Sequence, residues 1–107
     1  MIITNAELKR LYDSFNKKYF GNSLPKELPV VFQMLDSQRM MGRTIIYRGR
    51  HPMYIEIAVR YKGNLSLVAM TLLHEMLHVK YPKMDHGPKF HREMLRLAKA
   101  GAFKPYW

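Results

Sequence analysis

The stretch LSLVAMTLLHEMLHVK at residues 65–80 is apolar on nearly every side. Such a pattern is typical of a helix buried in a core, because a helix on the surface keeps a polar face. The break Lys62-Gly63-Asn64 precedes the stretch, with Asn64 or Ser66 as N-cap, and Pro82 follows it. Since Asn and Ser cap helices and Pro ends them, we expect one buried helix over 65–80.

Two further helices and three strands are expected around this helix. The capping box Thr4-Asn5-Ala6-Glu7 opens a helix over 4–20, and Gly21-Asn22 ends it. Three short apolar stretches predict strands over 30–35, 40–48 and 54–59, and their tight links favour an antiparallel or mixed sheet. A last helix is expected over 89–99, closed by Gly101. The predicted class is therefore α+β, with an N-terminal helix, a small three-stranded sheet, a buried active-site helix and a C-terminal helix.

Length and composition favour a single domain over residues 1–107. A chain of 107 residues, 48% of them hydrophobic, can bury a core without disulfide crosslinks. The chain contains no cysteine. This excludes a disulfide framework, a thiolate zinc site and a cysteine nucleophile. The N-terminus lacks the pattern of a signal peptide, and no apolar run reaches the roughly 18 residues of a membrane helix. We therefore expect a cytoplasmic protein without membrane contact.

The buried helix carries the motif His74-Glu75-Met76-Leu77-His78. Four residues are just over one helical turn, so the two imidazoles share a face, about 40° apart. At that separation two ring nitrogens can bind one zinc ion, and Glu75 beside them can act as general base on a water molecule. Lone histidines in helices are usually only packed or solvated. Here three ionisable groups lie in the most apolar helix, and a metal would offset the cost of burying them.

A catalytic zinc ion normally has three protein ligands and a water molecule, so a third ligand is needed. The candidates downstream are His86, His91 and Glu93. We favour His86, because it lies in a loop that can fold back on the metal, and consider His91 for contacting the substrate or orienting a ligand. Three neutral imidazoles leave the ion its full charge, which activates water and polarises a carbonyl group. This chemistry predicts amide hydrolysis with Glu75 as the proton carrier.

The sequence also resembles a known family. Leu-Leu-His-Glu-Met-Leu-His at 72–78, followed by His-Gly-Pro-Lys-Phe at 86–90, resembles the SprT-like zinc metallopeptidase domain of bacterial SprT and eukaryotic Spartan. The resemblance implies a minimal zincin-like fold, Glu75 as the catalyst, and one zinc ion held by His74, His78 and His86. It also implies peptide-bond cleavage and, for Spartan, proteolysis of proteins crosslinked to DNA.

The charge of the chain adds DNA as a candidate partner. Eighteen Lys and Arg against eight Asp and Glu give a formal +10, and nucleic acid is the commonest partner of such a field. The last helix has a basic stripe opposite its apolar face, formed by Lys89, Arg92, Arg96 and Lys99. A second basic cluster, beside Tyr47 and Tyr54, contains Arg48, Arg50 and His51. The plain alternative is that both are solvated surface.

Three functions are compatible with these residues. A zinc endopeptidase is favoured; the alternatives are a zinc-dependent nuclease and a non-catalytic zinc-stabilised nucleic-acid-binding module. The substitution Glu75→Gln separates them, because it removes the base and keeps the zinc ligands. A peptide substrate could be aligned by strand addition at an exposed sheet edge near the metal, for which the strand over 54–59 is the candidate.

Overall fold

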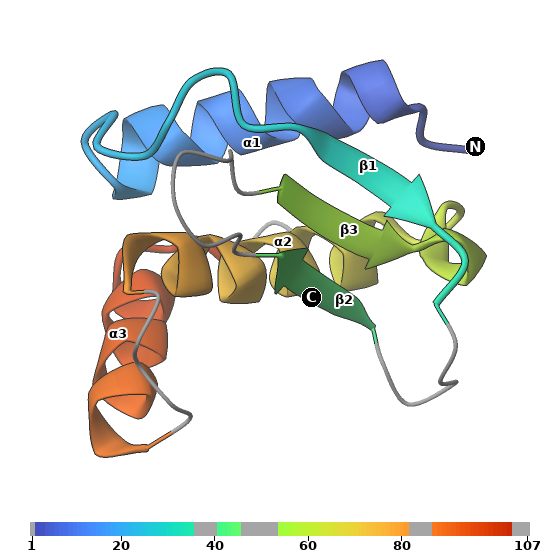
Figure 1. Cartoon of the computed structure of the whole chain (residues 1–107). Coiled ribbons are helices and arrows are strands. Elements are labelled where there is room, and N and C mark those ends of the chain that lie inside the picture. The colour runs from blue at the N-terminus through green and yellow to red at the C-terminus, as the bar shows by residue number, and fades with distance from the viewer. Residues whose placement is uncertain (1, 36–40, 46–53, 82–86, 104–107) are drawn as a thin grey trace.

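The computed structural model describes residues 2–35, 41–45, 54–81 and 87–103 (Figure 1). Within these residues the chain has the predicted α+β class. Its elements in chain order are α1 (Asn5–Tyr19), β1 (Val30–Gln33), β2 (Gly42–Ile45), β3 (Tyr54–Ala58), the short 3-10 helix η1 (Val59–Tyr61), α2 (Leu65–Lys80) and α3 (Pro88–Lys99). None of the helices in the described residues is long and apolar enough to span a bilayer.

The helix ends follow the local signals in the sequence. In the capping box of α1, the Glu7 backbone N–H donates to Thr4 Oγ1 and the Thr4 N–H donates to Glu7 Oε1, both at 3.1 Å. Gly21 and Asn22 follow α1 with φ of 58° and 59°, the left-handed conformation that ends helices. At α2 the cap is Asn64, whose Oδ1 accepts from the Leu67 N–H at 3.1 Å. Pro82, the predicted end signal of α2, lies outside the described residues.

The sheet is mixed, with strand order β1-β3-β2. Strand β1 runs parallel to β3, and β2 runs antiparallel to it. The prediction that the strand over 54–59 forms an exposed edge is therefore wrong, because β3 is the central strand and β1 and β2 form the edges. The edge was expected because Glu56 interrupts the apolar residues of this strand, as a polar residue facing solvent would. In the fold Glu56 is only 4% exposed and accepts from Arg43 Nε of β2 at 2.5 Å.

One face of the sheet and the helices form the core. The register places Ile55 and Ile57 of β3 beside Val30 and Phe32 of β1, and beside Thr44 and Gly42 of β2. Figure 1 shows α1 running along β1, α2 crossing near β2 and β3, and α3 lying beside the C-terminal end of α2. Helix α2 is largely buried, as predicted; its first turn, Met70, His74 and His78 are partly exposed, and its last residue is exposed. Its fully buried side chains include Val68, Leu72, Leu73, Met76 and Leu77.

Candidate metal centre

The fold brings the two motif histidines to one point on the surface of α2. Nε2 of His74 and Nε2 of His78 lie 3.3 Å apart, and the ring centroids are 5.1 Å apart. The side chain of His74 is 35% exposed and His78 is also half-buried, so both rings are reachable from solvent. The prediction that these imidazoles share a helix face is confirmed.

The separation of the two nitrogens suits one bound zinc ion. Two nitrogens at ~2.0–2.1 Å from a tetrahedral zinc ion lie about 3.3–3.4 Å from each other, by the geometry of the tetrahedron. The observed distance of 3.3 Å falls in that range. The two rings therefore need little rearrangement to act as ligands, and the donor set of neutral imidazoles is one that zinc prefers.

Glu75 lies beside this pair with its two carboxylate oxygens in different environments. Oε1 accepts a hydrogen bond from Thr44 Oγ1 at 2.9 Å, whereas Oε2 lies 4.0 Å from His74 Nε2. The residue is 6% exposed. Burial raises the pKa of Glu75, and the hydrogen bond from Thr44 opposes that rise. The sequence suggested only a metal to offset the burial of these groups, but for Glu75 the Thr44 hydroxyl supplies part of the compensation.

Strand β2 approaches α2 closely at this site because Gly42 has no side chain. A Cβ atom at Gly42 would lie 2.7 Å from Cγ2 of Thr71 and 3.0 Å from the carbonyl oxygen of Glu56. Thr71 is one helical turn before Glu75, and its buried Oγ1 has no hydrogen-bond partner among the residues that the structure describes. The close approach places Thr44, two residues after Gly42, within hydrogen-bonding distance of Glu75.

The first turn of α3 packs against the histidines. The ring of Phe90 is 3% exposed and lies 4.7 Å from the His74 ring and 5.1 Å from the His78 ring, centroid to centroid. The Phe90 and His78 rings are stacked, with 26° between their planes. Phe90 thus excludes water from one side of the imidazole pair and limits the orientations of both rings.

The candidates for the third ligand have different outcomes. His86 lies outside the described residues, so its prediction is untested. Glu93 is engaged elsewhere: it accepts from the Tyr81 hydroxyl at 2.8 Å and from Arg96 Nε at 2.9 Å. His91 is exposed on α3, one residue after Phe90. Between residues 2 and 103, omitting the undescribed segments, no group of three His, Asp or Glu side chains is arranged to hold a metal.

The predicted basic stripe lies on the solvent side of α3. Lys89, Arg92, Arg96 and Lys99 are exposed, while Phe90 and Leu97 are buried on the opposite face. Arg96 also donates to the carbonyl oxygen of Tyr19 at 3.2 Å, which ties α3 to the end of α1. The second predicted cluster, with Arg48, Arg50, His51 and Tyr47, lies outside the described residues.

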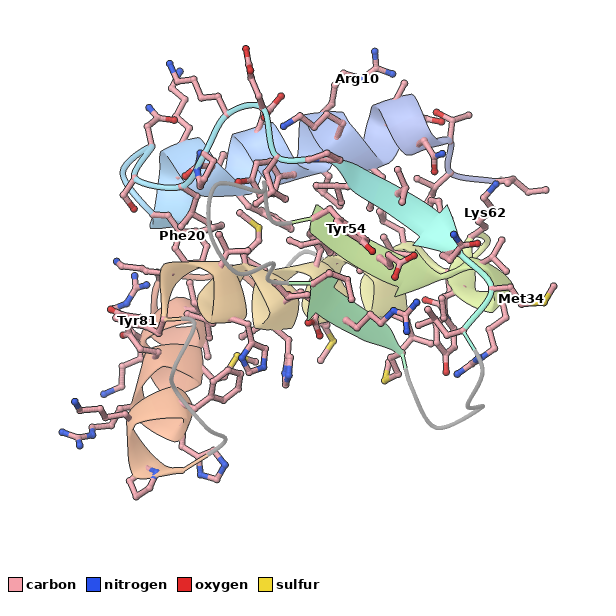
Figure 2. The ribbon with its side chains drawn as sticks, in the orientation of Figure 1. Arg10, Phe20, Met34, Tyr54, Lys62 and Tyr81 are labelled. Carbon is pink, nitrogen blue, oxygen red and sulfur yellow. The ribbon has the colours of Figure 1, made fainter. Side chains whose placement is uncertain are left out.

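The fold extends this stripe with cations from the other two helices. Lys17 and Lys18 lie in the last turn of α1, and Lys80 ends α2. Lys80 lies over the rings of Phe20 and Tyr81, 5.8 Å and 5.5 Å from their centroids. Both aromatic residues are labelled in Figure 2. We call the whole set the basic ridge; it consists of Lys17, Lys18, Lys80, Lys89, Arg92, Arg96 and Lys99.

Sequence reasoning missed two residues of the site. Thr44 was placed in a strand but given no role, because nothing local indicates that a strand residue meets a helix 31 positions later. Phe90 closes the motif at 86–90, but only the tertiary structure reveals that its ring covers the histidines. A signal for Thr44 does exist: it is a polar residue at an inward-facing position of its strand.

Comparison of the chain with protein-family models gave no match, and comparisons with curated proteins and with solved structures gave none either. The resemblance to the SprT-like domain therefore depends on the residues of this sequence alone.

Proposed function

We propose that the protein is a zinc-dependent metallopeptidase that cleaves peptide bonds within polypeptide chains. One observation supports this most directly: two Nε2 atoms lie 3.3 Å apart, with Oε2 of a buried carboxylate 4.0 Å from one of them. Two metal-ligand atoms with an adjacent, non-ligating carboxylate are what a metal-assisted hydrolase needs. A histidine pair with a purely structural role would not need a carboxylate buried beside it.

Three histidines would hold the ion in this proposal, namely His74, His78 and His86. Phe90 supports the choice of His86, because it touches both other imidazoles and follows residue 86 by only four positions. The exposure of His91 and the engagement of Glu93 by Tyr81 and Arg96 argue against those two alternatives.

Bound zinc would supply a Lewis acid that makes water more acidic and polarises the peptide carbonyl group. Glu75 would take the proton of that water through Oε2 and later deliver it to the leaving nitrogen. Burial, which raises the pKa of Glu75, makes its carboxylate a stronger base than an exposed one. Phe90 keeps one side of the histidine pair dry, which strengthens the electrostatic interactions within the site.

An extended substrate could be aligned along β2. This strand carries Thr44 next to Glu75, and in the described part of the chain it pairs only with β3. Its other edge can therefore accept the backbone hydrogen bonds of an added strand, as in other cases of strand addition. The strand over 54–59, which the sequence favoured for this role, is replaced by β2 because β3 lies between β1 and β2.

The substitution Glu75→Gln tests the proposal. The amide oxygen of Gln can still accept from Thr44, whereas its NH₂ group cannot take a proton, so fold and zinc content are expected to be unchanged. We expect the zinc-loaded wild type to cleave an unfolded protein such as β-casein and the variant to be at least ~100-fold slower, the usual contribution of a general base. Peptides are detected by mass spectrometry and zinc by elemental analysis.

Three outcomes would contradict the proposal. If Glu75→Gln cleaves as fast as the wild type, Glu75 is not the base. If the wild type cleaves RNA and leaves β-casein intact, the protein is a nuclease. If it binds zinc and hydrolyses neither, the zinc stabilises a binding module.

A second proposed activity is sequence-independent binding of nucleic acid along the basic ridge. The ridge holds seven cations from three helices, and Glu93 is the acidic side chain paired with one of them. Phe20, the aromatic ring under Lys80 and Arg96, is only 4% exposed and cannot stack on a base. The ridge is therefore suited to phosphates rather than to base recognition.

This second proposal is tested by the salt dependence of DNA binding. Neutralising three ridge cations together, Lys89→Gln, Arg92→Gln and Lys99→Gln, is expected to weaken binding of a single-stranded 30-mer. It should also lower the slope of log K against log salt by about 2, at ~0.7 per lost phosphate contact. The matched control removes three exposed cations outside the ridge, Arg10, Lys26 and Arg60 (Arg10 is labelled in Figure 2). Equal losses in both triple variants would mean that only the net charge matters.

A further inference from the structure

The hydroxyl of Thr44 contacts the candidate base from the neighbouring strand. Thr44 Oγ1 lies 2.9 Å from Oε1 of Glu75 and 3.0 Å from the backbone carbonyl oxygen of the same residue. Both contacts join the edge strand β2 to the middle of α2, 31 residues apart in the chain. A hydroxyl group has one proton to donate, and an ionised carboxylate is a stronger acceptor than a carbonyl group. The bond to Oε1 is therefore the dominant one when Glu75 is ionised.

This hydrogen bond makes the two carboxylate oxygens unequal. The terminal torsion of a Glu side chain has a broad, roughly two-fold energy profile, so a carboxylate without a partner rotates easily. With Oε1 bound to Thr44, the rotation is restricted and Oε2 is the oxygen that lies on the side of His74, 4.0 Å from Nε2. One donor on β2 thus selects the oxygen that faces the histidine pair.

Thr44 itself is held firmly. A β-branched side chain has a restricted χ1 angle, so its hydroxyl has few alternative positions. The backbone of β2 is fixed by its pairing with β3, in which Thr44 lies opposite Ile55 and Gly42 lies opposite Ile57. Gly42 allows this strand to lie against Thr71 of α2, at a distance that any Cβ atom would prevent. The donor therefore belongs to a rigid strand and not to a mobile loop.

We propose that Thr44 is a positioning residue for the reaction: its hydroxyl holds Oε1 of Glu75 so that Oε2 is the oxygen presented to the reacting water. The inference rests on the proposed peptidase function. It predicts that Thr44 affects the rate of the chemical step and leaves zinc binding and substrate binding unchanged, because its side chain acts on the base alone. A misplacement of about 1 Å at a reacting group can lower a rate by ~10²-fold.

The test compares three substitutions of Thr44 in the zinc-loaded protein. Thr44→Val keeps the shape and removes the hydroxyl, Thr44→Ser keeps the hydroxyl and removes the methyl group, and Thr44→Ala is a second hydroxyl-free variant in case Val does not fold. We expect kcat to fall about 10- to 100-fold in Thr44→Val and Thr44→Ala. In Thr44→Ser it should stay within about 3-fold of the wild-type value. KM and zinc content should be unchanged in all three.

A second measurement does not depend on activity. Crystal structures of the metal-free wild type and Thr44→Val should show one orientation of the Glu75 carboxylate in the former and a rotated or split carboxylate in the latter. The inference is overturned if Thr44→Val keeps the wild-type kcat, if Ser falls as far as Val, or if the carboxylate is unmoved in the Val variant. An inactive wild type would instead overturn the proposed function, and with it the catalytic role of Thr44.

Discussion

Zinc is expected to stabilise the fold through His74 and His78, and the removal of one ring should abolish that effect. The perturbation is His78→Ala, compared with the wild type in the presence of a chelator and of excess zinc. Because the two nitrogens already lie 3.3 Å apart, binding requires little rearrangement, and most of the binding free energy should appear as stability. His91→Ala is the matched control, since His91 is exposed on α3.

The size of the effect follows from the length of the chain. Zinc at a hundred times its dissociation constant adds ~2.7 kcal/mol to the free energy of unfolding. For 107 residues, at ~2.1 cal/mol/K each, the unfolding entropy is about 0.22 kcal/mol/K. The melting temperature should therefore rise by roughly 12 °C in the wild type and in His91→Ala. Without zinc, His78→Ala should lose about 1 kcal/mol, because its ring no longer stacks on Phe90.

The assay is thermal unfolding followed by circular dichroism, with each variant compared with its own metal-free form. That comparison separates the loss of the metal from the loss of ring packing. A zinc-dependent rise of the same size in His78→Ala as in the wild type would refute the assignment of this residue as a ligand. If zinc no longer raises the melting temperature of His91→Ala, His91 is itself a zinc ligand.

Two further predictions concern the elements around the site. Gly42→Ala should lower the free energy of unfolding by ~1–3 kcal/mol, because the new methyl group would lie 2.7 Å from Cγ2 of Thr71. In the double variant with Thr71→Ser, that Cγ2 atom is absent, and part of the lost stability should return, as measured by urea unfolding. If no stability returns, the strain lies at another contact. Burial alone would raise the pKa of Glu93, but hydrogen bonds from Tyr81 and Arg96 outweigh it and hold this pKa below its ordinary value. This stabilisation is present above the unfolded pKa of ~4.3 and is lost as pH falls through the lower folded pKa. Glu93→Gln should therefore be about 1 kcal/mol less stable than wild type at pH 7, and this difference should shrink as the pH is lowered. A difference in stability that does not change with pH would show that the charge of Glu93 does not cause it.

Most of the helices could be predicted because their signals are local. The capping box at Thr4, the left-handed residues after α1 and the cap at Asn64 act within one turn of the helix they define. The limits of α2 agree with the prediction for this reason. The three strands were also found, although strand pairing was not, because periodicity within a strand carries no information about its neighbours.

The candidate site divides in the same way. His74, Glu75 and His78 lie within five consecutive residues, and helical geometry alone places the two imidazoles on one face. The contacts that surround them come from β2 and α3, which are distant in sequence. Thr44 reaches Glu75 from the edge of the sheet, and Phe90 covers both rings from the next helix.

The sequence by itself determined the helical elements, the α+β class and the paired imidazoles with a carboxylate beside them. All of these depend on interactions between residues less than two helical turns apart. Only the tertiary structure decided that β3 is the central strand, that Glu75 is hydrogen-bonded by Thr44, and that the cations of three helices form one ridge. These features depend on which distant segments meet. That choice is made by the burial of apolar surface over the whole chain, and no short segment contains it.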